Sequence, residues 1–144
     1  MNAKIEDLMN SRVMTVQPHQ TFGHVKTLMH DHSISCLPVV GPDNEPVGIV
    51  TASDLLDDHA DGTHISQFMS SNVYTVPVYG DPSLAARIMR NHHIHHVVVT
   101  HEQEIVGILS SFDLLQLVED HRFVMKGAPS KSKQKGKRQK TEAN

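Results

Sequence analysis

The spacing of apolar and polar residues near the start of the chain predicts one small α/β unit. A short β-branched run ends at a proline, a threonine then precedes apolar residues at helical spacing, and two continuous apolar runs flank a turn. In that order, these patterns are typical of a strand, a capped helix and a hairpin. The unit is predicted as a strand at 13–16, a helix after Thr21, strands at 36–40 and 47–51, and a second helix from Thr51 or Ser53.

The same pattern occurs twice. A shift of 60 residues superposes similar residues, and after a one-residue deletion within 41–47 the shift becomes 59. Because a unit this short rarely buries its apolar face alone, the two copies are expected to share one core. We predict repeats at 1–62 and 63–125. The second copy predicts strands at 73–76, 97–100 and 105–110 and helices at 82–91 and 111–118.

The motifs of the two repeats carry a resemblance to a known family. Residues 48–54 read Gly-Ile-Val-Thr-x-x-Asp and residues 107–113 read Gly-Ile-Leu-Ser-x-x-Asp, while Val-x-Thr-Val opens both copies at 13–16 and 73–76. The chain therefore resembles a tandem pair of CBS domains, called a Bateman module, over residues 1 to about 120. The resemblance implies two β-α-β-β-α units packed about a pseudo-twofold axis. It also implies a homodimer and a regulatory module that binds adenine nucleotides and requires no cofactor.

The duplicated hydroxyl and acid pairs could hold a nucleotide. Thr51 and Ser110 stand at helix starts, where unpaired backbone N–H groups attract anions such as phosphate. Asp54 and Asp113 follow three residues later and offer two acceptor oxygens each, which suit the two hydroxyls of a ribose. In the alternative interpretation, the hydroxyls only cap the helices and the acids only offset the helix dipole. The sequence leaves both interpretations open.

The resemblance also implies which residues face one another in two clefts. The ligand would be AMP, ADP, ATP or an S-adenosyl compound, bound as a signal. One cleft would join Thr51, Ser53 and Asp54 with Val73, Thr75, His95 and His96; its mirror would join Ser110 and Asp113 with Val13, Thr15, Ser35 and Cys36.

The two predicted clefts differ at the position that would meet a phosphate. His96 occupies it in one cleft and Cys36 in the other, and only histidine carries positive charge near neutrality. We therefore expect the Asp54 cleft to hold the more phosphorylated or tighter-bound ligand, and its affinity to fall as pH rises past the histidine pKa. Asp54→Ala should weaken binding more than Asp113→Ala. Phe112 replaces a serine of the first repeat and is expected to narrow the Asp113 cleft.

Charge is distributed unevenly along the chain. The net charge of −3 combines about −9 over residues 1–125 (six Lys and Arg, fifteen Asp and Glu) with about +6 over 126–144 (seven Lys and Arg, one acid). The terminal segment has too few apolar residues to order itself, so a disordered basic tail is expected at 126–144. This tail would either keep the protein soluble or bind nucleic acid or an acidic partner. An alternative function is therefore a dimeric scaffold that acts through this tail.

Composition and spacing argue against other classes of function. Four histidines within 92–96 could serve a metal sensor, but three or four converging ligands are not evident, so no metal site is assigned. No phosphate-binding glycine loop, serine elbow or paired acids indicate an enzyme. No apolar run is long enough to span a bilayer. One cysteine excludes an intrachain disulfide. A cytoplasmic protein without catalytic activity is expected.

Overall fold

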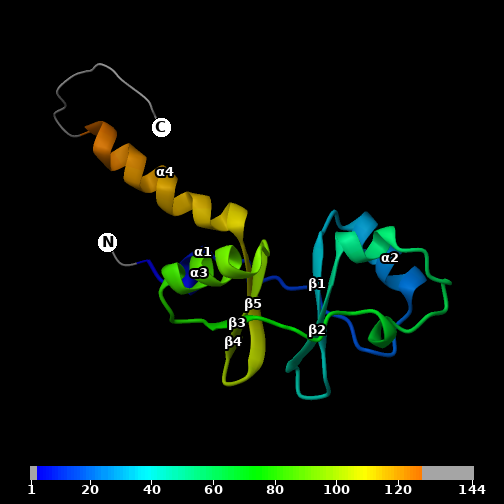
Figure 1. Ribbon diagram of the computed structural model, residues 1–144. Coiled ribbons are helices and arrows are strands. Elements are labelled where there is room, and N and C mark those ends of the chain that lie inside the picture. The colour runs from blue at the N-terminus through cyan, green and yellow to red at the C-terminus, as the bar shows by residue number, and fades with distance from the viewer. Residues whose placement is uncertain (1–2, 128–144) are drawn as a thin grey trace. The chain divides into compact units, whose positions relative to one another are not determined.

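The computed structural model describes residues 3–127 and contains a mixed α/β fold built from two repeats (Figure 1). The fold class predicted from the sequence is confirmed. Most of the tail expected at 126–144 lies outside the described residues. No helix among the described residues has both the length and the apolar character that crossing a membrane requires. The elements are α1 (Ile5–Leu8), α2 (Phe22–Asp31), β1 (Cys36–Val40), β2 (Pro46–Thr51), η1 (Ala52–Leu56), η2 (Ile65–Gln67), β3 (Thr75–Pro77), α3 (Pro82–His92), β4 (His96–His101), β5 (Glu104–Ser110) and α4 (Ser111–Gly127).

The strands form two sheets. β1 and β2 form an antiparallel pair, and β3, β4 and β5 form a three-stranded sheet in which β3 runs parallel to β4. Figure 1 shows α2 beside the first sheet and α3 with α1 beside the second. Thr21 caps α2 by accepting a hydrogen bond from the backbone N–H of His24, as the sequence predicts. Asp81 caps α3 in the equivalent way through the N–H of Ser83.

The strand predicted at 13–16 is wrong, and a proline explains it. Only Val16 pairs with β1, through a single parallel bridge to Val39. In the second repeat, the N–H of Val98 donates to the carbonyl of Tyr74 and helps β3 to form. Pro38 occupies the position equivalent to Val98 and has no N–H to donate, so the ladder beside β1 is cut short.

The second helices of the two repeats also differ from prediction. The first repeat has only the short 3₁₀ helix η1, whereas α4 continues to Gly127, past the predicted end at 118. The residues that follow η1 include Asp57, Asp58 and Asp61. Acids are poor helix formers at a helix C-terminus because they face its negative dipole end. In α4 the positions equivalent to Asp57 and Asp58 hold Gln116 and Leu117, which are better helix formers.

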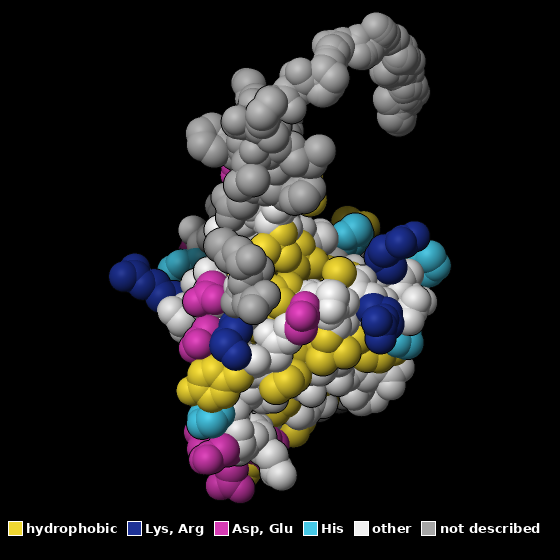
Figure 2. Space-filling model, turned by 90° about the vertical axis from the view of Figure 1, so that its left-hand side faces the viewer, with side chains coloured by type: hydrophobic (Ala, Val, Ile, Leu, Met, Phe, Trp, Pro, Cys, Tyr) yellow, Lys and Arg dark blue, Asp and Glu magenta, His cyan; other side chains and the backbone are white. Residues whose placement is uncertain are grey.

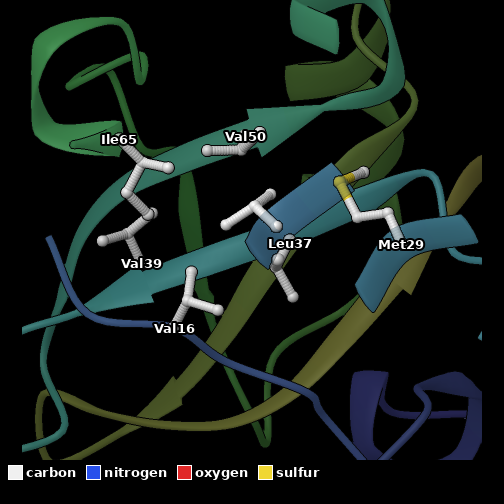
Figure 3. Packing of buried hydrophobic residues seen from close by; sticks show 7 residues of the cluster. Val16, Met29, Leu37, Val39, Val50 and Ile65 are labelled. Carbon is white, nitrogen blue, oxygen red and sulfur yellow. The ribbon is translucent and has the colours of Figure 1, made fainter. Parts of the chain in front are cut away.

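Each repeat completes its core with a segment from the other repeat. Val16, Leu37, Val39 and Val50 pack with Met29 of α2 and with Ile65, which belongs to the sequence of the second repeat (Figure 3). The N–H of Ile65 donates to Gln20, and in the equivalent exchange the N–H of Ile5 donates to Gly80 at 3.0 Å. Fully burying one such side chain stabilises a fold by roughly 1.5–3 kcal/mol. The short segments α1 and η2, which the sequence did not predict, therefore hold the two repeats together.

The same exchange continues along the strands. Ile49 of β2 exchanges two backbone hydrogen bonds with Ser70, and Ile108 of β5 does the same with Asn10. Next to these pairs, Gly48 lies against Met69, and Gly107 lies against Met9 in the same way. A Cβ atom on either glycine would overlap the methionine sulfur. Glycine at these positions lets a methionine of the other repeat approach the backbone closely.

This packing predicts the effect of filling the space at Gly48. Gly48→Ala should lower the free energy of unfolding by about 1–3 kcal/mol, because the new methyl group displaces Met69 from its site. Gly62→Ala is the matched control, since nothing lies within 4 Å of its added Cβ. Urea denaturation of both variants measures the difference. Equal stability of the two variants would contradict the packing described here.

Candidate functional site

A cleft of about 650 Å³, here called the first cleft, lies between residues of both repeats. One side is formed by the end of β2 and the start of η1. The other is formed by the end of α3 and the start of β4, with the segment that precedes β3. The lining residues are Ser35, Cys36, Ile49, Thr51, Ala52, Ser53, Asp54, Ser70, Asn72, Tyr74, His92, His93, Ile94, His95, His96 and Val98.

Asp54 is fixed at the start of η1 by a helix cap. Its Oδ2 accepts hydrogen bonds from the backbone N–H of Thr51 at 2.8 Å and from the Thr51 hydroxyl at 3.3 Å. Ser53 places its hydroxyl 2.9 Å from that of Thr51. The capping interpretation of this motif is therefore realised. Both bonds use Oδ2, so the cap holds the carboxylate in place while Oδ1 stays available as an acceptor for a ligand hydroxyl.

The equivalent motif of the second repeat forms the same kind of cap. Asp113 Oδ2 accepts from the N–H of Ser110 at 2.9 Å, and the Ser110 hydroxyl accepts from the N–H of Asp113 at 3.0 Å. This is a reciprocal capping box. Phe112, beside Asp113, is 78% exposed and does not fold inward to narrow the space around the motif, contrary to expectation.

The wall of the first cleft that faces Asp54 is rich in rings. Tyr74 stacks on His92 with ring centroids 4.2 Å apart and an angle of 25° between the planes. His93 ends α3 in the left-handed conformation, with φ of 55°, and this turn directs the chain from the helix into β4. The histidine run therefore has a structural position at a helix exit, and it brings His92, His95 and His96 to the same cleft.

His96 is less able to carry charge than the sequence suggests. Burial lowers its pKa from the usual 6.5, the neighbouring His95 lowers it further, and Asp113 acts in the opposite direction. The imidazole is therefore mainly neutral at pH 7. The expectation that His96 provides a positive charge near neutrality is corrected: a half-buried imidazole next to a second imidazole loses its proton more easily.

Cys36 is a buried thiol at the border of two cavities. Burial, with a smaller contribution from Asp54, raises its pKa to about 12. The thiol is therefore protonated at physiological pH, which makes it a poor nucleophile. It contributes packing and a weakly polar surface.

A second cleft of about 540 Å³ is the repeat-related counterpart of the first. Adding 60 to the numbers of its lining residues, or subtracting 59 in the case of Ile108, gives for most of them a residue that lines the first cleft. Arg12 corresponds to Asn72, Met14 to Tyr74 and Cys36 to His96. The two clefts therefore share one backbone framework and differ in side chains. The second is lined by Asn10, Ser11, Arg12, Val13, Met14, His32, Ile34, Cys36, Pro38 and Ile108.

The structure brings together some of the residues assigned to the sites by sequence. Thr51, Ser53, Asp54, His95 and His96 all line the first cleft. Ser35 and Cys36, assigned to the mirror site, also line the first cleft, and Cys36 and Val13 line the second. Val73 packs instead against the buried cluster of Val40, Val98 and Ile105. Thr15, Thr75, Ser110 and Asp113 are not among the lining residues of either cleft.

Several lining residues were missed by sequence reasoning. Asn72 and Tyr74 precede β3, and Arg12 and Met14 precede the segment that pairs with β1. All lie at equivalent positions of the repeat, just before the Val-x-Thr-Val pattern or within it. Comparing the side chains at those equivalent positions is the signal that could have found them. Among the side chains that the structure describes, those of residues 3–119, no group of three or more His, Cys, Asp or Glu could hold a metal ion.

Known proteins share the fold and the repeat. A family model described as CBS domain matches residues 5–60 and again 65–120. The chain is 30% identical over 121 residues to the CBS domain-containing protein YhcV of Bacillus subtilis, covering 78% of this chain and 83% of that protein. The structure of the CBS domain pair of protein MJ0100 in complex with 5′-methylthioadenosine and S-adenosyl-L-methionine matches with a TM-score of 0.76 and 23% identity, covering 84% of this chain and 99% of that one.

Some curated relatives are much longer than this chain. The chain is 33% identical over 116 residues to homoserine O-acetyltransferase of Methanosphaerula palustris, which covers 79% of this chain and 24% of that protein. It spans only 24% to 32% of the length of three curated relatives, this one included.

The lowered pKa of His96 predicts a loss of stability in acid. His96 binds a proton less readily in the folded state than in the unfolded state, so its neutral form stabilises the folded state above pH 6.5. This stabilisation is lost as the pH falls below 6.5. Urea denaturation at pH 7.5 and pH 5 should show a smaller acid-induced loss for His96→Gln than for the wild type. His24→Gln, at an exposed position of α2, is the control and should behave as the wild type does. An unchanged pH dependence in His96→Gln would contradict the assignment.

The raised pKa of Cys36 predicts a slow reaction with thiol reagents. At pH 7.5 the folded protein should not be alkylated by iodoacetamide over an hour, because the thiolate is scarce and the side chain is buried. In 6 M guanidinium chloride the same thiol should react within minutes. Mass spectrometry follows both reactions, and rapid alkylation of the folded protein would show that Cys36 is more accessible than described.

Proposed function

Because the chain belongs to the CBS-domain family, we propose that it is a regulatory module that binds an adenine nucleotide or an S-adenosyl compound in its clefts and catalyses no reaction. The observation that carries this proposal is the first cleft itself, where Asp54 of one repeat faces Tyr74 and the histidine run of the other. Its volume of about 650 Å³ lies within the range of small-molecule sites, roughly 300–1,000 Å³.

The first cleft offers complementary groups for each part of an adenosine compound. Asp54 presents Oδ1 for ribose hydroxyls, while the stacked Tyr74 and His92 offer a flat apolar surface for a base. The solved relative that holds 5′-methylthioadenosine and S-adenosyl-L-methionine supports this class of ligand.

The proposed regulation follows from the position of the cleft. A ligand that contacts both repeats favours the arrangement in which its contacts are best, and it shifts the population by its difference in affinity. Such coupling is typically about 1–3 kcal/mol. The homoserine O-acetyltransferase named above is matched over a quarter of its length, and no group in either cleft has the properties of an activated nucleophile.

We also propose that the module is a homodimer. Among the described residues, Leu55 packs on the core of the first repeat, while the next residue, Leu56, is 86% exposed. Leu115, the equivalent of Leu56 in the second repeat, is 56% exposed. Figure 2 shows hydrophobic side chains at the surface, interspersed with acidic and basic ones. Exposed leucines at equivalent helix positions suit a second copy of the chain.

A melting-temperature screen tests the function. The full chain is mixed with adenosine, 5′-methylthioadenosine, S-adenosylmethionine, AMP, ADP or ATP, and at least one compound should raise the melting temperature. A ligand at a hundred times its Kd adds about 2.7 kcal/mol of stability. Guanosine and GTP are the matched controls. If none of the adenosine compounds raises the melting temperature or gives heat in calorimetry, the proposed function is wrong.

The role of Asp54 is tested with adenosine, which has the ribose and no phosphate. Asp54→Ala should lower adenosine affinity at least tenfold in calorimetry, because the ribose loses its acceptor. Asp113→Ala should change it less than threefold, since Asp113 does not line the first cleft. Asp81→Ala removes a capping acid that lines neither cleft and controls for the loss of a cap. Equal losses in Asp54→Ala and Asp113→Ala would contradict the assignment.

A further inference from the structure

The two clefts have the same framework and opposite fixed charges. Apart from histidines, the one ionisable side chain that lines the first cleft and is charged at pH 7 is the carboxylate of Asp54. In the second cleft it is the guanidinium of Arg12. A permanently charged guanidinium can bind phosphate through two parallel hydrogen bonds, which a carboxylate cannot. The lining residues therefore favour an anionic ligand in the second cleft and disfavour one in the first.

The histidines do not reverse this difference. His96, which is the residue of the first cleft equivalent to Cys36, is half-buried, and burial with His95 beside it lowers its pKa. Asp113 is the acid whose charge acts on His96, and Asp54 is the acid whose charge acts on Cys36. The first cleft thus has an acid, Asp54, and no permanent cation among its lining residues.

The aromatic surfaces differ in the same direction. In the first cleft Tyr74 stacks on His92, and the two rings together form part of the wall. In the second cleft the equivalent pair is Met14 and His32, and a flexible thioether replaces the phenol ring. A base stacked on an aromatic ring gains substantial affinity without any charge. The first cleft therefore has the means to bind an adenosine compound by its base and ribose alone.

We propose that the two clefts sort adenosine compounds by charge: the first binds an adenosine without phosphate, and the second binds a phosphorylated adenosine through Arg12. This inference rests on the proposed function and goes beyond it by assigning a ligand class to each cleft. It also reverses the order expected from sequence, where His96 was to hold the phosphate. One chain can then bind two regulatory ligands at the same time, one without phosphate in the first cleft and one anionic in the second.

Substitutions that exchange equivalent residues between the repeats test the proposal. Arg12→Asn gives the second cleft the residue of the first, and Tyr74→Met gives the first cleft the residue of the second. Each new side chain already occurs at the equivalent position of the fold. Calorimetry with the full chain uses adenosine and ATP as probes, at fixed ionic strength. The melting temperature of each variant without ligand shows that it is folded.

The expected result is a crossed pattern. Arg12→Asn should lower ATP affinity at least tenfold and leave adenosine affinity within twofold of the wild type. Tyr74→Met should lower adenosine affinity at least fivefold and leave ATP affinity within twofold. Adding Asn72→Arg to Arg12→Asn should restore ATP affinity in part, because the first cleft then carries the guanidinium.

The other outcomes separate this inference from the proposed function. If ATP and adenosine bind but both variants weaken both probes equally, or if only Tyr74→Met weakens ATP, the sorting by charge is wrong and the proposed function stands. If the wild type binds neither probe and no other adenosine compound, the proposed function fails and the inference fails with it. A variant that melts well below the wild type is replaced by Arg12→Gln or Tyr74→Leu, and the same pattern is required.

Discussion

The exchange of short segments between the repeats is the interaction on which the rest of the structure depends. Ile65 fills the core of the first repeat, and Ile5 makes the equivalent hydrogen bond to the second. A repeat of about sixty residues exposes too much of its surface to be stable alone. Because each core needs a residue of the other repeat, neither repeat is expected to keep its fold without its neighbour. The clefts are a consequence, since they form where the exchanged segments and the strands of the two repeats meet.

The exchange also explains why two equivalent clefts can differ in chemistry. The framework is fixed by buried residues, by glycines packed against methionines and by backbone hydrogen bonds, and these are the same in both repeats. The lining side chains that differ between the repeats at positions 12 and 72 are exposed, and those at positions 14 and 74 are partly exposed. Tyr74 and Met14, or Asn72 and Arg12, can therefore differ without loss of the fold. The repeat provides equivalent lining positions in both clefts, and different side chains at those positions allow each cleft to bind a different ligand.

The sequence predicted the elements whose signals are local. The strand at 36–40 and the helix capped by Thr21 follow from a continuous apolar run and from a hydroxyl before apolar residues at helical spacing, and both are found. The strand at 13–16 fails because it depends on a hydrogen bond from its neighbour, where Pro38 has none to give. The first cleft gathers Asp54 with His95 and His96 as the family resemblance implies, but the charge of His96 depends on burial, which spacing does not reveal. α1 and η2 were missed because their stability comes from the other repeat.

The two interpretations of the hydroxyl and acid motif are compatible, and their combination restricts how a ligand can bind. An acid that caps a helix contributes about 0.5–2 kcal/mol, which is lost if a ligand takes the same oxygen. In the first repeat the cap uses Oδ2 of Asp54, so a ligand hydroxyl that approaches Oδ1 gains a hydrogen bond and leaves the cap in place. The cap also limits the rotation of the carboxylate, so little side-chain entropy is lost on binding. A structural cap at this position therefore prepares the acid for a ligand rather than competing with it.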